Sequence, residues 1–389
     1  MAGSLKKIVF VFAVCIATCH GAAIGTPSFA TKVAKGLRLI ETAEGVAPVW
    51  MTQQEKLELL RKDKNFFDVT NTYDPAELSV GSLTGGRRPS PKPLAAEVTF
   101  DAPSKQAVVT PLLAKVSVEN MQLLLGNLTA FYNRFFESET GAAASFWIHD
   151  TVADFGDAFP DSELEVFLFE HNFTQTSIIA RFPGEDPDGP VTILGAHMDS
   201  INLDDVNGRA PGADDDGSGS VNLLEAVRVL AESGFQPKTP VEFHWYAAEE
   251  VGLLGSQDIA KTYNDTGVEV KGMLQFDMTA FVKPGSEEVI ALMPDFTNGN
   301  LTNFVGSLID TYSTLNFTIN NPCGFACSDH ASWDKFGYPT ALPFEGTFPD
   351  NANEIIHSDG DTVDLEGFSW SHTLEYTKLA VAYAIELAA

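Results

Sequence analysis

Positively charged residues are scarce in this chain. Its 389 residues include 24 Lys and Arg against 53 Asp and Glu, which gives a formal net charge of −29. A chain with this balance repels nucleic-acid phosphates and anionic lipid headgroups. We therefore expect no nucleic-acid partner and no role at a membrane surface.

Long apolar runs and phosphate-binding loops are also missing. No apolar run after the N-terminus approaches the ~20 residues that cross a bilayer. The sequence has neither an internal repeat nor a glycine-rich phosphate fingerprint. With 44% hydrophobic and 11% aromatic residues, however, the chain can bury a large core. These features predict a soluble globular protein.

Residues 1–21 are predicted to be a secretory signal peptide. Lys6 and Lys7 precede an apolar run over residues 8–19, and small residues follow near Gly21. This order of charge, apolar run and small residues is typical of a cleaved export signal. A buried first helix is the alternative, but nothing amphipathic follows the run. We expect a secreted, extracellular protein.

Cysteine is rare, and Cys15 and Cys19 belong to the predicted signal peptide. Cys323 and Cys327 remain, and an even pair in an exported protein predicts a disulfide. Because the loop is very short, chain entropy gives this bridge at most about 2 kcal/mol. Export is also consistent with N-glycosylation at five Asn-x-Ser/Thr sequons. These are Asn127, Asn172, Asn264, Asn300 and Asn316.

Residues 22–88 differ in composition from the rest of the chain. They contain nine basic and eight acidic residues, and they run into a Gly- and Pro-rich stretch over 81–93 that includes Arg87-Arg88. A near-neutral leader with a dibasic site in a flexible linker is typical of a pro-enzyme. We predict a propeptide over 22–88 and a mature domain over 89–389. An ordinary N-terminal subdomain is the alternative.

Short β-rich runs alternate with helical patterns in the mature domain. Apolar residues repeat at helical spacing over 121–135 and 223–230, and a closing helix is expected over 373–387. This interleaving predicts an α/β fold, a single globular domain with a central twisted mixed, largely parallel β-sheet flanked by helices. Strands are expected over 165–169, 177–182, 191–195, 241–247, 273–276 and 340–344.

Acidic and histidine residues follow three of these strands. They are, in chain order, His197 and Asp199, Glu249 and Glu250, and Asp277. Asp214–Asp216 precede the helix over 223–230. Ligands in α/β sheets gather beyond the carboxyl ends of the strands, so these residues are expected in one crevice.

Each of these residues also has a structural explanation when taken alone. The three aspartates could cap a helix, the two glutamates could be a solvated strand end, and the histidine could lie in the core. Together, however, so many carboxylates would repel one another unless a cation neutralised them. Imidazole and carboxylate ligands without a free thiol favour zinc over manganese or cobalt.

Six sequence blocks resemble the secreted di-zinc aminopeptidases, the family of the bacterial and fungal leucine aminopeptidases. They occur in order and with similar spacing over roughly 89–389. The resemblance implies a zinc-exopeptidase fold and removal of N-terminal residues, preferentially leucine and other large apolar ones, from peptides. The blocks are GAHMDS (195–200), PGADDDGSG (211–219), YAAEEVGLLGS (246–256), QFDMT (275–279), CGFACSDHASW (323–333) and NEIIHSDGDT (353–362).

The resemblance also implies two Zn²⁺ per chain. Asp215 would bridge both ions. His197 and Asp277 would complete one site, and Glu250 and His357 would complete the other.

Four more residues receive roles from the same resemblance. Glu249 would act as general base and then as general acid. Asp199 would lie behind the ligands and orient His197 through its far ring nitrogen. Asp216, like Asp214, would have a structural role behind the ligands.

An apolar S1 pocket is implied beside the metal ions. It would discriminate weakly between large side chains, because one methylene is worth ~1–3 kcal/mol. Phe325 departs from the family, since the bacterial relative carries a tyrosine there. The pocket residues would be Met278, the Cys323–Cys327 turn with Phe325, Leu342, Phe344, Phe348 and Ile356.

Three alternatives remain open at this point. A glutaminyl-peptide cyclase would share the scaffold but use one zinc, whereas the five-ligand set is complete. A carboxypeptidase would need an arginine for the substrate carboxylate, and the mature region is poor in arginine. An inactive binding module would have lost ligands, and none is missing. The expected partners are peptides with a free N-terminus, and the protein is expected to be a monomer.

Overall fold

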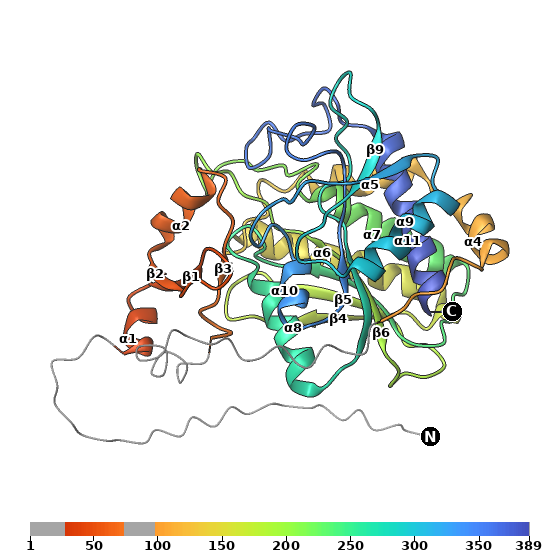
Figure 1. Ribbon diagram of the computed structural model, residues 1–389, viewed down its shortest axis with the longest axis horizontal. Coiled ribbons are helices and arrows are strands. Elements are labelled where there is room, and N and C mark those ends of the chain that lie inside the picture. Colours follow the sequence, from red (N-terminus) through yellow and green to blue (C-terminus); the bar gives the residue numbers. More distant parts are fainter. Residues whose placement is uncertain (1–27, 74–97, 389) are drawn as a thin grey trace.

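A six-stranded mixed β-sheet lies at the centre of residues 28–73 and 98–388, the parts of the chain that this computed structural model describes (Figure 1). In spatial order its strands are β11 (Thr340–Ala341), β8 (Val270–Gln275), β6 (Val191–His197), β7 (Val241–Tyr246), β5 (Ser177–Phe182) and β4 (Glu165–Phe169). Neighbours from β11 to β7 pair in parallel, whereas β7–β5 and β5–β4 are antiparallel. The predicted α/β class with a mixed, largely parallel sheet is confirmed.

Helices cover both faces of this sheet. They are α4 (Gln106–Leu113), α5 (Val118–Leu128), α6 (Glu139–Ala158), the short 3₁₀ helix η1 (Pro160–Ser162), α7 (Gly217–Glu232), α8 (Leu254–Thr266), α9 (Gly299–Tyr312), α10 (His330–Lys335) and α11 (Trp370–Ala388). One face packs against α5, α6, α7 and α11 through a cluster that includes Leu194 and Phe243. The other packs against α8 and α10 through Ile193 and Trp333. Every residue of β6 and β7 is therefore buried, as in strands covered on two faces.

The helix expected over 121–135 is shorter in the structure. α5 ends at Leu128, where the Thr129 hydroxyl donates to the carbonyl of Leu125. The chain then turns so that Arg134 is fully buried and donates to carbonyls of the loop between β6 and α7. Contacts distant in the sequence thus end the helix where the apolar spacing alone would continue it.

The strand expected over 340–344 is divided between two sheets. Thr340–Ala341 pairs with β8 as β11, whereas β12 (Pro343–Phe344) pairs antiparallel with β9 (Val289–Leu292). β10 (Asn316–Ile319) completes this second sheet in the order β10-β9-β12. The division at Leu342 brings the small sheet next to the strand ends of the large one.

Residues 28–73 form a separate small sheet beside the α/β domain. In chain order the elements are α1 (Phe29–Val33), β1 (Arg38–Glu41), β2 (Val49–Met51), α2 (Gln53–Leu60) and β3 (Phe67–Asp68), and the antiparallel sheet has the order β2-β1-β3. Asp68, whose side chain is fully buried, accepts from Lys56 Nζ and Arg38 Nε, both at 2.8 Å. This ion cluster fastens β3 to β1 and α2.

We call residues 28–73 the N-terminal segment; it lies at one side of the molecule, drawn in red (Figure 1). Its backbone at Asp68 donates to the carbonyl of Gly252 at 3.1 Å. Gly252 has φ +111°, and a Cβ there would lie 2.8 Å from the Asp68 nitrogen. Arg61 also donates to the carbonyl of Leu203. The segment therefore contacts two loops of the α/β domain, one through its main chain at Asp68 and one through the side chain of Arg61.

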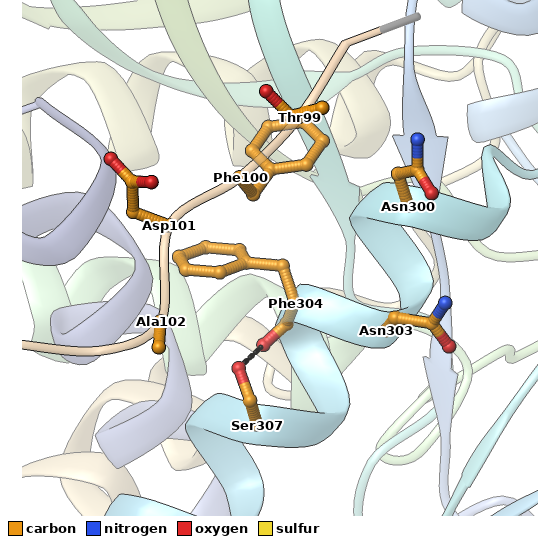
Figure 2. Close-up of a pocket in the computed structure, with 8 residues that line it drawn as sticks. All are labelled: Thr99, Phe100, Asp101, Ala102, Asn300, Asn303, Phe304 and Ser307. Atoms are coloured by element: carbon orange, nitrogen blue, oxygen red, sulfur yellow. Dashed lines mark hydrogen bonds between the residues drawn. The ribbon is translucent and has the colours of Figure 1, made fainter.

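The second described part of the chain begins along α9 (Figure 2). Phe100 stacks on Phe304 with ring centroids 5.5 Å apart, and Asn300 Nδ2 donates to the carbonyl of Val98 at 3.0 Å. Phe100, Asn300 and Phe304 line a surface cavity of about 440 Å³. The sequon at Asn300 thus has its amide engaged by the chain itself and its Thr302 buried. The sequons at Asn127, Asn172 and Asn316 are exposed, and that at Asn264 is half-buried.

The predicted signal peptide and the Arg87-Arg88 pair lie outside the described residues. Within the described ranges, no single helix is long and apolar enough to cross a bilayer. One pair meets the length and composition criterion together, α4 with α5, and it is bent by 64° at its break.

Lys56→Met is expected to destabilise the N-terminal segment. The substitution removes one of the two cations that pair with the buried Asp68 carboxylate, and Arg38 and the hydrogen bonds from Thr70 remain. Removing one partner of a buried ion pair costs about 3–5 kcal/mol when the other charge is left unpaired. Because Arg38 remains, we expect a loss of about 1–3 kcal/mol in the free energy of unfolding, measured by denaturant titration. The control Lys62→Met, at an exposed position, should change it by less than about 0.5 kcal/mol. Equal losses in the two variants would contradict the role of the ion cluster.

Candidate metal centre

Five predicted metal ligands converge at one edge of the large sheet. His197 ends β6, Asp277 follows β8 and Glu250 follows β7. These three strands are parallel neighbours, so their carboxyl ends share that edge. Asp215, just before α7, and His357, in the loop that follows β12, join them there.

The ligand atoms form two groups that share Asp215. His197 Nε2 lies 3.1 Å from Asp215 Oδ1 and 3.7 Å from Asp277 Oδ1. His357 Nε2 lies 3.1 Å from Asp215 Oδ2 and 3.0 Å from Glu250 Oε2. The two oxygens of Asp215 thus face different histidines. Within each group the potential ligand atoms all lie within 4.8 Å of one another.

Carboxylates behind the ligands hold the ligand backbone. Asp361 accepts from the amides of Asp214 and Asp215 at 3.1 and 3.0 Å. Asp216 accepts from the amide of His197 and from that of Gly219 in the first turn of α7, both at 3.0 Å. Asp216 therefore ties the end of β6 to the start of α7, which places Asp215 opposite His197.

Asp199 lies close to His197 but its hydrogen bonds go elsewhere. Its two oxygens accept from the amides of Glu249 and Glu250 at 3.0 and 3.2 Å. His197 Nδ1 is 3.5 Å from Asp199 Oδ1, longer than an ordinary hydrogen bond, and is buried without a hydrogen-bond partner. Asp199 therefore fixes the turn that carries Glu249 and Glu250, and its carboxylate also faces Nδ1 of His197, the ring nitrogen through which it is expected to orient this residue.

The electrostatics of the group suit a cation. Burial acts to lower the pKa of His197, but Asp277 and other carboxylates hold it well above the usual value. Burial similarly opposes a high pKa at His357, and Glu250 and Asp215 raise it well above normal. Burial raises the pKa of Glu250 to about 7 and that of Asp214 to about 6. Without ions these side chains must retain protons, whereas divalent cations would neutralise the same carboxylates. Two imidazoles and three carboxylates fit zinc.

The residues predicted for the S1 pocket separate into two places. Five of them share one apolar cluster with Cys323, and Met293 and Ala352 also belong to it. The five are Met278, Leu342, Phe344, Phe348 and Ile356. Phe325 instead packs edge-on against Phe67 of the N-terminal segment, with ring centroids 5.4 Å apart, and against Phe296. The predicted disulfide between Cys323 and Cys327 is present.

Sequence reasoning missed several supporting residues. Ser328 Oγ donates to Asp277 Oδ2, and Asp361 holds the amides beside Asp215. Both residues lie inside the quoted sequence blocks, so their neighbourhood was visible although their roles were not. Met293 was missed because only the small sheet brings it to the pocket. Arg134 was missed too, although a single charged residue among the aromatic residues of 131–136 could have marked it as unusual.

Known proteins are similar to this chain in sequence and in fold. The profile of peptidase family M28 matches residues 177–384. Leucine aminopeptidase 1 of Coccidioides posadasii is 41% identical over 355 residues, 87% of this chain and 86% of that protein. A probable leucine aminopeptidase of Arthroderma otae is 37% identical over 385 residues, 98% of each chain. The LapA aminopeptidase structure of Legionella pneumophila matches with a TM-score of 0.80 at 29% identity, covering 92% of this chain and 96% of that one.

Metal loading near neutral pH is expected to release protons. The pKa values of His197 and His357 are raised, so both imidazoles stay charged to higher pH than usual, and a protonated imidazole cannot bind a metal. Apparent metal affinity should therefore rise with pH through the neutral range. Calorimetric zinc titrations in buffers of different ionisation enthalpy would count the released protons. His149→Gln, on α6, should leave that count unchanged. Zinc binding without proton release would contradict this electrostatic description.

Proposed function

The chain belongs to peptidase family M28 and is a zinc-dependent aminopeptidase; from this premise we propose that it binds two Zn²⁺ ions and removes leucine and other large apolar residues from peptide N-termini. The observation that carries the two-ion proposal is the position of Asp215. Its oxygens face His197 and His357 separately, and each histidine has a further carboxylate nearby. Such an arrangement supports one ion on each side of a shared carboxylate.

Glu249 is the proposed proton carrier. Bound zinc ions would supply Lewis-acid polarisation of the scissile carbonyl and lower the pKa of the attacking water. Glu249 precedes the ligand Glu250, and Asp199 holds the amides of both. Burial raises the pKa of Glu249 well above the usual value, which favours its taking a proton. Glu249 accepts the proton of the attacking water and returns it to the departing amine.

The substrate is held through its N-terminus and its first side chain. The free α-amine of a peptide is held at the metal-carboxylate cluster, and internal peptide bonds lack this group. The first side chain enters the apolar cluster that follows Asp277, where Met278, Met293, Leu342 and Phe344 are buried. The names of the relatives, leucine aminopeptidases, support a preference for leucine.

We also propose that the protein is made as a secreted precursor. Residues 1–21 direct export, residues 22–88 form the propeptide, and 89–389 is the catalytic domain. The contacts of the N-terminal segment with Gly252 and Phe325 lie beside Glu250 and the disulfide turn. A segment docked there can influence the loops that frame the centre. Glycans are proposed at the exposed sequons Asn127, Asn172 and Asn316.

Hydrolysis of Leu-4-nitroanilide tests the proposed function. We expect release of nitroaniline, loss of release with a zinc chelator, and recovery on adding zinc. Elemental analysis should give two zinc ions per chain. N-acetyl-Leu-4-nitroanilide, which lacks the free amine, should not be cleaved, and an N-terminal glutaminyl peptide should not be cyclised. A single zinc in the fully active protein would refute the two-ion proposal.

Glu249→Gln is expected to separate metal binding from catalysis. The glutamine keeps the shape of the side chain and leaves all five proposed ligands in place, so both zinc ions should remain. Loss of the proton carrier should lower kcat by about 10²–10⁴-fold. The control Glu185→Gln, at an exposed position, should keep the wild-type kcat. A near-normal rate in Glu249→Gln would place the base elsewhere.

A further inference from the structure

Arg134 is a fully buried arginine beside the metal centre. It lies in the turn between α5 and α6 and is among the largest side chains that are completely buried in the described residues. Burying a guanidinium is costly unless its N–H groups are satisfied, since this group keeps its proton. The N–H groups of Arg134 must therefore be satisfied by acceptors around it.

Three main-chain carbonyls accept from its guanidinium group. Nε donates to Met198 at 2.7 Å, Nη2 to Gly212 at 2.9 Å, and Nη1 to Pro211. Met198 directly follows His197, and Gly212 precedes Asp215 by three residues. One planar group thus joins the two ends of the single loop, residues 198–216, that connects β6 to α7.

The surrounding structure is shaped to admit this group. Gly212 has φ +52°, and a Cβ there would lie 2.7 Å from Arg134 Nη2. The backbone of Arg134 is anchored too, because its amide donates to Ser200 Oγ at 3.1 Å and its carbonyl accepts from Gln175. Ser200 in turn donates to the carbonyl of Ala210 at 2.9 Å. The guanidinium and the amide of Arg134 are thus held by the 198–216 loop, and its carbonyl is held by Gln175.

The charge of Arg134 is set among the acids behind the ligands. Burial lowers its pKa, and the carboxylates of Asp361, Asp199, Asp216 and Asp215 act in the opposite direction. These are the acids that hold or form the ligand set. The cation therefore offsets part of the negative charge of these acids.

We propose that Arg134 is a positioning residue of the metal centre, whose guanidinium sets the separation between His197 and Asp215. This inference rests on the proposed two-zinc function. A lysine could keep the charge but not the planar fork that reaches several carbonyls at once. A purely structural arginine would stabilise the fold with and without zinc equally. A positioning arginine would also change the affinity for zinc.

Zinc affinity of Arg134→Met and Arg134→Lys, measured by competition with a chromogenic chelator, tests the proposal. Loss of a residue that orients ligands is expected to weaken metal binding about 10–100-fold, with lysine giving the smaller loss. The zinc-induced rise in Tm should shrink accordingly. The visible spectrum of the Co²⁺-substituted protein should also shift, because it reports ligand geometry.

Arg181→Met is the matched control. Arg181 is a partly buried arginine on β5 that pairs with Glu242. Its loss should lower Tm but leave zinc affinity and the Co²⁺ spectrum unchanged. Ser200→Ala removes the acceptor of the Arg134 amide and the donor to the Ala210 carbonyl but leaves the guanidinium in place, and it should weaken zinc binding less than Arg134→Lys does. That milder variant keeps the test available if Arg134→Met does not fold.

The outcomes separate this inference from the proposed function. Wild-type zinc affinity and Co²⁺ spectra in Arg134→Lys and Ser200→Ala, together with two zinc ions in the wild type, would overturn the positioning role alone. A wild-type protein that holds fewer than two zinc ions would overturn the two-ion function itself. Weaker zinc binding in the Arg134 variants but not in Arg181→Met supports the inference.

Discussion

Mutual repulsion among buried carboxylates is the constraint on which this centre depends. The structure divides these acids into two kinds. Asp199, Asp216 and Asp361 each accept from two backbone amides, which offsets their charge within the protein. Asp215 and Glu250 instead face the imidazoles of His197 and His357, so their negative charge lies inside the proposed metal centre. Cations bound between Asp215, Glu250 and the histidines would neutralise this second kind of acid. The acids held by backbone amides fix the loops that carry the ligands.

The order of the strands in the large sheet already brings three of the proposed ligands together. Because β8, β6 and β7 are parallel neighbours, a ligand at or just beyond the end of each needs no special loop. His357 is different, since it comes from a long loop after β12. Its carbonyl accepts from the amide of Leu203, whose own carbonyl accepts from Arg61. The N-terminal segment is thereby coupled, through a single residue, to the loop that carries a proposed ligand.

The sequence predicted what depends on local pattern and failed where distant contacts decide. Buried runs such as those of β6 and β7 and the acids after them were evident, and so was the class of fold. The end of α5 was not, because Arg134 is drawn toward carbonyls far along the chain. Nor was the division at Leu342, which follows from pairing with β9. Phe325 was assigned from resemblance alone, but Phe67 of the N-terminal segment occupies its surroundings.

The same geometry weighs against the alternative activities. A cyclase with one zinc would have no need for a carboxylate whose two oxygens face different histidines, yet Asp215 has that position. A carboxypeptidase needs a cation free to bind the substrate carboxylate. Arg134 lies beside the centre, but carbonyls occupy its guanidinium from the protein side. No cation in this position is therefore free to hold a C-terminal carboxylate, which agrees with the proposed binding of the substrate through its N-terminal amine.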